Sequence, residues 1–169
     1  MQYMKPEELI DFLKKELKES LLDIRLDIKK EGIKQKENHN IWLEIKREKL
    51  IDAIELISTL HYPHISIIAG EDNGENVILT YLMSIYYGEE GKEVCLNIKV
   101  KLDIKEPSIS TITDIIPGAQ TTEREIKEMF GVNFVGLPDM HNIFLPEDFP
   151  KNIYPFRKNQ KGLDDLIQK

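Results

Sequence analysis

The 169-residue sequence has little cysteine, no long apolar run and no excess of positive charge. Cys95 is the only cysteine, so the chain can form no internal disulfide and cannot by itself ligate an iron–sulfur cluster or a cysteine zinc site. No window approaches the roughly 20 apolar residues that a membrane-spanning helix needs. The net charge of -7 argues against nucleic-acid and anionic-membrane partners, because those require clustered lysine and arginine.

The composition is otherwise that of a folded protein, with 41% hydrophobic and 31% charged residues. The first twenty residues alternate charged and apolar side chains, unlike the apolar core of a secretory signal, so export is not expected. Cys95 lies in the apolar run EVCLNIKV and is interpreted as a small core residue. Trp42 alternates with apolar residues and is interpreted as structural.

Hydrophobic periodicity predicts helices and strands in the first two thirds of the chain. Pro6 and the apolar spacing after it favour a first helix of about four turns. Helical spacing through Leu50, Ile54 and Ile57 predicts a second helix. Strands are predicted for DIRLDIKKEG, NIWLEIKRE, HISIIAG, NVILTYLMSIYYG and KEVCLNIKVKLD.

The last third of the chain has a different character. From Gly131 onward, four prolines exclude a continuous helix or a central strand: Pro138, Pro146, Pro150 and Pro155. The same segment is rich in large apolar side chains, each of which forfeits about 1.5–3 kcal/mol when it stays in water. This arm must therefore lie against its own domain or against a partner.

These patterns together predict an α+β fold. It has a small, mostly antiparallel sheet of four to five strands with helices on one face, plus an extended proline-rich C-terminal arm. The predicted domains are residues 1–116, the α+β domain, and residues 117–169, which hold a short helix and the docking arm.

The stretch TTEREIKEMFGVNF (121–134) predicts that short helix. Thr122 and Glu125 have the spacing of a capping box, and Gly131 is placed to end the helix in a left-handed cap. A polar helix that leads into an apolar extended arm is typical of a docking surface. Two pairs of opposite charge stand four positions apart and are expected to pair along the helix surface: Glu123 with Lys127, and Arg124 with Glu128.

Two other kinds of site are weaker candidates. Glu147 and Asp148 are adjacent in LPEDFP, but neighbouring carboxylates in an extended segment tend to point apart, unlike the facing pair of a hydrolase. His61 and His64 stand three apart and His141 follows Asp139, yet no third metal ligand has convincing spacing.

Residues 112–158 resemble the C-terminal signature of the thirty-kilodalton subunit family of NADH:quinone oxidoreductase (complex I). That family includes the matching subunits of membrane-bound energy-converting NiFe hydrogenases. The resemblance rests on five blocks in the family's order: Glu123-Arg124-Glu125, Glu128-Met129-Phe130-Gly131, Pro138-Asp139, Leu145-Pro146-Glu147-Asp148 and Pro155-Phe156-Arg157-Lys158.

Departures from the family pattern indicate an adapted interface. Thr121 stands where the family usually has Trp, Leu137 where it has His, and His141 and Asn142 where basic residues are common. The spacer EDFPKNIYPFRK resembles the hydrogenase-associated branch more than the respiratory one.

The resemblance implies a subunit with no redox centre, no catalytic residue, and no cofactor or metal of its own. The NiFe site and iron–sulfur clusters are expected in partner subunits: a large hydrogenase-like or quinone-site subunit, and cluster-bearing small subunits. Contact with the cytoplasmic face of the membrane would occur only through that complex. The predicted partner interface comprises Glu123, Arg124, Glu125, Phe130, Phe134, Pro138, Asp139, Phe144, Pro146, Glu147, Asp148, Pro155, Arg157 and Lys158.

The leading hypothesis is therefore a non-catalytic peripheral subunit of an ion-translocating NiFe hydrogenase that docks on the large catalytic subunit. The alternatives are the thirty-kilodalton subunit of a complex I-type NADH or quinone dehydrogenase, a freestanding enzyme that uses Glu147, Asp148 or the histidines, and an adaptor for an unrelated partner.

Overall fold

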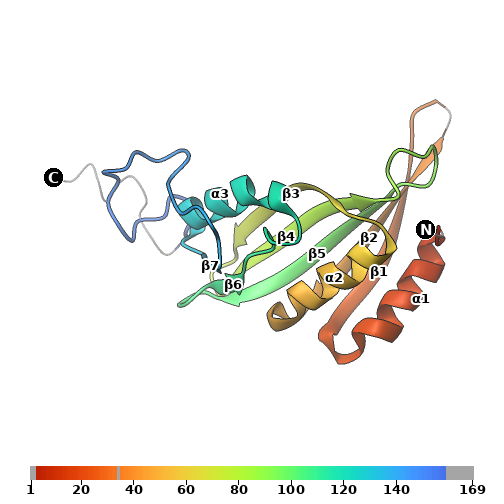
Figure 1. Cartoon of the computed structure of the whole chain (residues 1–169), viewed down its shortest axis with the longest axis horizontal. Helices are drawn as coiled ribbons and strands as arrows, with labels where there is room; N and C mark the ends of the chain where they lie inside the picture. Colours follow the sequence, from red (N-terminus) through yellow and green to blue (C-terminus); the bar gives the residue numbers. More distant parts are fainter. Residues whose placement is uncertain (1–2, 34, 159–169) are drawn as a thin grey trace. The chain divides into compact units, whose positions relative to one another are not determined.

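The computed structural model describes residues 3–33 and 35–158 of the chain (Figure 1). These residues form two compact units. Unit 1 contains the described residues up to Ile67 together with Thr80–Val100, and unit 2 contains Ile68–Leu79 together with the described residues from Lys101 onward. The units interleave along the chain, whereas the sequence predicts one boundary after residue 116; that boundary stays a prediction.

The helices and strands follow the predicted order. The α-helices are α1 (Pro6–Leu17), α2 (Leu50–Leu60) and α3 (Gln120–Phe130). The long strands are β1 (Leu21–Glu31), β2 (Lys36–Ile45), β3 (His64–Asp72), β4 (Asn76–Ile85) and β5 (Val94–Asp103). Two short strands, β6 (Ser108–Ser110) and β7 (Asn133–Val135), flank α3.

The five long strands form one sheet in the order β1-β2-β5-β4-β3. β1 and β2 are an antiparallel hairpin, whereas β2 and β5 run parallel, with Glu44 opposite Lys99. The α+β class and the mostly antiparallel sheet are confirmed. The parallel β2–β5 ladder is the exception within that sheet.

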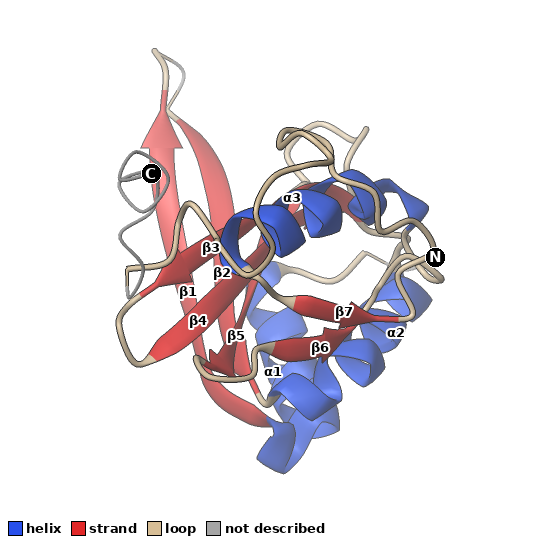
Figure 2. Ribbon diagram, turned by 90° about the vertical axis from the view of Figure 1, so that its left-hand side faces the viewer, coloured by secondary structure: helices blue, strands red, loops and turns tan. Residues whose placement is uncertain are grey.

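Unit 1 is held together by apolar stripes on α1 and α2, which lie on the same side of the sheet (Figure 2). Pro6 opens α1, and the Lys5 backbone N–H donates to Glu8 Oε2 at 3.0 Å, which satisfies a free donor at the helix start. The buried core side chains of these two helices are Leu9, Leu13, Leu17, Leu50, Ala53, Ile54 and Ile57.

The helix α1 is shorter than predicted. It ends at Leu17, and the alternating residues after Ser20 join β1 because Leu21 and Ile24 pair across the sheet with Ile45 and Leu43. Cross-strand pairing, which is a tertiary effect, extends the strand predicted from Asp23 back to Leu21.

Unit 2 is built around α3. β6 and β7 pair in parallel, and α3 is the crossover that such a pair requires. No strand was predicted between residues 107 and 119, so β6 was missed. α3 packs against β3 at Gly70, where an added Cβ would lie 2.6 Å from Phe130 Cε2. Only glycine fits there without a shift of the Phe130 and Ile126 side chains.

The C-terminal arm, defined here as residues 136–158, follows β7 and contains neither helix nor strand. Its proline spacing predicts this result. In the described part of the chain, no helix combines the length and apolar character needed to cross a bilayer.

Candidate partner interface

The helix α3 begins earlier than the sequence suggested. Pro117 starts a 3-10 turn that continues into Gln120, so Thr122 is already inside the helix and its Oγ1 donates to the Ala119 carbonyl at 3.0 Å. The predicted capping box at Thr122 is therefore wrong. The predicted end is confirmed: Gly131 is left-handed, with φ of 71°, and its N–H donates to the Lys127 carbonyl at 2.9 Å.

Glu123 is fully buried and fixes α3 to the segment after β6. Its carboxylate accepts hydrogen bonds from the Ile112 N–H, at 2.9 Å, and from the Thr111 hydroxyl. Burial raises the pKa of Glu123, and the two hydrogen bonds only partly oppose that rise. This carboxylate therefore ties two parts of unit 2 together and presents no free face to a partner.

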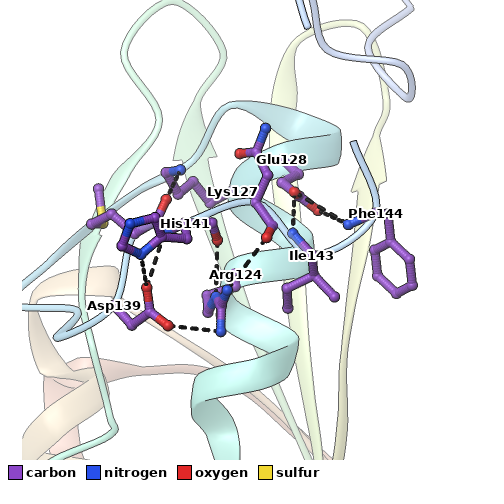
Figure 3. Close-up of polar contacts among 9 residues, drawn as sticks. Arg124, Lys127, Glu128, Asp139, His141, Ile143 and Phe144 are labelled. Atoms are coloured by element: carbon purple, nitrogen blue, oxygen red, sulfur yellow. Dashed lines mark hydrogen bonds and ion pairs between the residues drawn. The ribbon is translucent and has the colours of Figure 1, made fainter. Parts of the chain in front are cut away.

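Three charged residues of α3 hold the chain's own arm, and we call Arg124, Lys127 and Glu128 the α3 clamp (Figure 3). Arg124 Nε donates to the His141 carbonyl at 2.9 Å, and Lys127 Nζ donates to the Met140 carbonyl at 2.6 Å. The buried Glu128 carboxylate accepts the backbone N–H groups of residues 143 and 144.

The predicted pairing along the helix surface is therefore wrong. Glu123 accepts a hydrogen bond from the segment after β6, and Arg124 donates to the arm. Within α3, which the structure describes in full, neither side chain forms an ion pair with the residue four positions later. An exposed ion pair along a helix stabilises the fold by only about 0.3–0.5 kcal/mol. Hydrogen bonds from nearby backbone N–H groups stabilise a buried carboxylate more than that.

Asp139 completes the clamp from the arm side. Arg124 Nη1 lies 2.9 Å from Asp139 Oδ2, and the His141 backbone N–H donates to Asp139 Oδ1 at 3.0 Å. This backbone hydrogen bond, followed by the contacts with the His141 ring and with Arg124, lowers the pKa of Asp139. The carboxylate thus remains charged and keeps residues 139–144 closed on the helix.

The far end of the arm is fixed within unit 2 by Arg157, which is buried. Its Nη1 donates to the Phe130 carbonyl at 3.1 Å and its Nη2 to the Ile104 carbonyl at 2.5 Å. Its Nε forms an ion pair with the buried Asp72 carboxylate, 3.2 Å from Oδ2. Arg157 therefore joins β3, α3 and the arm within one unit.

The predicted interface residues separate into three groups by exposure. The buried group faces its own chain and consists of Glu123, Phe130, Phe134 and Arg157. The half-buried group is Arg124, Glu125, Asp139 and Pro155, and the exposed group is Pro138, Phe144, Pro146, Glu147, Asp148 and Lys158. Contact with a partner stays a prediction for all of them, and the exposed group offers the most side-chain surface to one.

Several large apolar side chains of this arm are exposed to solvent. Phe144 is 61% exposed and Phe156 is 57% exposed, although Phe156 also packs edge-to-face on Phe130. Met140 and Ile143 are also exposed, at 45% and 36%, and the predicted site omitted both. The signal for them was their place in an apolar segment whose prolines forbid regular structure.

A hollow of about 440 Å³ lies between the end of α3 and the arm, lined in part by Val132, Phe149 and Tyr154. Its charged lining is balanced, with Lys127 and Lys151 against Glu128 and Glu147, so it selects no ligand by charge.

The candidate metal-binding histidines of unit 1 lie among aromatic rings. His61 stacks edge-on against Tyr86 and Tyr87, and His64 also meets Tyr87. Among residues 3–33 and 35–158, no three side chains of His, Cys, Asp or Glu lie close enough to hold a metal ion. Burial raises the pKa of the half-buried Cys95 thiol.

The fold and this arrangement can be compared with known proteins. Residues 43–165 match the family described as "Respiratory-chain NADH dehydrogenase, 30 Kd subunit", and the chain belongs to that family. It is 34% identical to membrane-bound hydrogenase subunit beta of Pyrococcus furiosus, over 76% of this chain and 75% of the relative. It is 27% identical to NADH-quinone oxidoreductase subunit 5 of Thermus thermophilus, over 71% of this chain and 61% of the relative.

The fold also recurs in a solved structure. A chain of the membrane-bound sulfane sulfur reductase, described as an archaeal respiratory membrane complex, superposes with a TM-score of 0.74. The alignment covers 96% of this chain and 89% of that one at 20% identity, so the likeness concerns the fold alone. The family resemblance inferred from the signature blocks is confirmed by the family match and the relatives.

Proposed function

We propose that the chain is a non-catalytic structural subunit of a membrane-bound, ion-translocating NiFe hydrogenase, and that it docks on the large catalytic subunit. The observation that carries this proposal is the 34% identity to a membrane-bound hydrogenase subunit beta across about three quarters of both chains. The NADH-quinone oxidoreductase relatives match at 27% to 31% identity, below this value, which favours the hydrogenase branch.

The chain's own chemistry supports this role. A single cysteine with a raised pKa is unsuited to bind a cluster, so redox centres belong to partner subunits. Burial of the exposed apolar side chains of the arm against a neighbouring protein would be favourable by about 25 cal/mol for each Å² removed from water. The chain would lie at the cytoplasmic face of the membrane and touch it only through the complex.

A second candidate is the thirty-kilodalton subunit of a complex I-type NADH or quinone dehydrogenase. The family description and the Thermus thermophilus relative favour it. It differs from the first candidate in the partner, which would carry a quinone site in place of a NiFe site.

The test is affinity purification of the tagged full-length chain from its source organism in mild detergent, with quantitative mass spectrometry of the associated subunits. We expect a NiFe-type large subunit at a ratio near one to one, and hydrogen evolution from a low-potential donor. Stoichiometric quinone-site and NADH-oxidising subunits would establish the second candidate. If the chain emerges without any oxidoreductase subunit, or turns over a substrate alone, both proposals fail.

A further inference from the structure

The α3 clamp holds five consecutive residues of the arm through their backbone atoms. The carbonyl of Met140 accepts from Lys127, and the carbonyls of the next two residues accept from Arg124, at 2.9 Å and 3.4 Å. The N–H groups of Ile143 and Phe144 both donate to Glu128. The main chain of this loop, residues 139–144, is therefore fixed to the helix without the help of its apolar side chains.

Because the backbone faces α3, the apolar side chains are free to project outward. Met140, Ile143 and Phe144 all belong to the exposed large hydrophobic residues, and they occur within five positions of one another. Single exposed apolar residues are ordinary on a protein surface, but a cluster on a rigidly held loop indicates an interaction site. Charge-assisted hydrogen bonds of the clamp are stronger than neutral ones, so the loop is ordered before any partner arrives.

We propose that loop 139–144 is a preorganised docking element. Its Phe144 side chain, flanked by Ile143 and Met140, enters an apolar pocket on the large subunit. Arg124, Lys127 and Glu128 act as positioning residues that touch the loop and not the partner. The inference rests on the proposed function for the identity of the partner, but the division of labour between clamp and loop comes from this chain's own contacts.

The charges beside the loop specify the border of the pocket. Between residues 139 and 150 three side chains are acidic: Asp139, which is paired with Arg124, and Glu147 and Asp148; Lys151 follows this stretch. Glu147 and Asp148 are exposed directly after the apolar cluster. A partner pocket bordered by lysine or arginine complements this pattern. An anionic lipid surface does not, because it attracts basic segments.

Preorganisation explains why the charged α3 clamp lies next to the exposed aromatic side chain of Phe144. A flexible loop loses side-chain and backbone freedom when it binds, and that loss weakens association. Here the clamp orders the backbone during folding, so docking needs to immobilise only the side chains. A central aromatic anchor in a fitted pocket is the arrangement that typically carries most of the binding energy of an interface.

The test titrates full-length variants onto the complex purified from a strain that lacks this chain. Phe144→Ala should weaken the apparent affinity by about 30-fold or more, as expected for an anchor residue, without changing the melting temperature of the free chain. Tyr62→Ala is the matched control, since Tyr62 is 50% exposed but lies in unit 1, and it should bind like the wild type.

Glu128→Gln separates positioning from contact. It keeps the shape of the side chain but removes its charge, so hydrogen exchange of the Ile143 and Phe144 amides should rise in the free chain. The variant should weaken binding in the wild-type background, yet have no further effect in the Phe144→Ala background. Additive losses would show that Glu128 touches the partner directly, which overturns the assignment of roles.

The same variants, tagged and expressed in the deletion strain, give an independent measure in the large subunit retained per tagged chain. If Phe144→Ala and the wild type retain the same amount of large subunit, the docking element is refuted but the proposed function stands. Failure of the wild type to recruit any large subunit would remove the proposed function itself. If Phe144→Ala assembles normally but no longer binds anionic vesicles, the loop contacts lipid and not the large subunit.

Discussion

Removal of the Arg157 guanidinium should strongly destabilise unit 2. Arg157 and Asp72 form a buried ion pair, and the guanidinium also donates to the carbonyls of Ile104 and Phe130. Breaking a buried pair by removing one partner typically costs about 3–5 kcal/mol, because it leaves an uncompensated charge in a dry site.

The expected loss for Arg157→Ala lies at the lower end of that range. Asp72 keeps two backbone donors, the N–H of Gly74 at 2.8 Å and the N–H of Lys158 at 3.0 Å, which continue to stabilise its charge. We therefore expect a loss of about 3 kcal/mol, equivalent to a shift of roughly 150-fold in the unfolding equilibrium.

The assay is urea unfolding of the free chain at pH 7, combined with hydrogen exchange to locate the loss in unit 2. Lys158→Ala is the control: the residue reaches Asp72 through its backbone N–H, which the substitution keeps, so the change should stay within about 0.5 kcal/mol. The double variant with Asp72→Asn should lose less free energy of unfolding than the sum of the losses of the two single variants, because neither substitution then leaves an unpaired charge behind. A loss below about 1 kcal/mol for Arg157→Ala, or one equal to that of Lys158→Ala, would refute the reasoning.

Three further predictions concern single residues. Gly131→Ala should be less stable than Gly91→Ala by about 1–3 kcal/mol in urea unfolding, because both sites have a positive φ but only the first would place its Cβ 2.5 Å from Tyr154; equal losses would contradict this. Burial raises the pKa of Glu123, so the contribution of this carboxyl to folding stability is greatest below the ordinary carboxyl pKa and declines as pH rises through the raised value. Melting temperatures measured against pH should show a flatter decline for Glu123→Gln, and an unchanged profile would count against the assignment. The Cys95 thiol, with its raised pKa, should react slowly with a thiol reagent at pH 7 in the native chain and rapidly in urea; equal rates would exclude its protection.

Local periodicity was sufficient to find the helices and the five long strands, because each has an apolar pattern matched to its geometry. Its limits lie at the element boundaries. Pairing with β2 extends β1 back to Leu21, two residues before the strand predicted for DIRLDIKKEG. Similarly, Pro117 moves the start of α3 upstream of the predicted cap, so that Thr122 becomes an interior residue.

The candidate site was located from the sequence, but its contacts were not. Spacing of four residues suggested pairs within α3, whereas Arg124 and Glu128 reach the backbone of the arm, 15 to 18 positions away. The pairing of Arg157 with Asp72 joins residues still farther apart. Nothing local in a sequence specifies such contacts, because they depend on which segments the fold brings together.

The parallel ladder between β2 and β5 also sets an expected order of events during folding. Each of its pairs joins residues 55 positions apart, as Glu44 and Lys99 are, whereas the β1–β2 hairpin closes over a short turn. Closing a long loop costs more chain entropy before any contact compensates it, so the hairpin is expected to form early and the central ladder late. Until then the edge of β2 stays open to pairing with other chains, and a nascent chain would be most prone to aggregate in that interval.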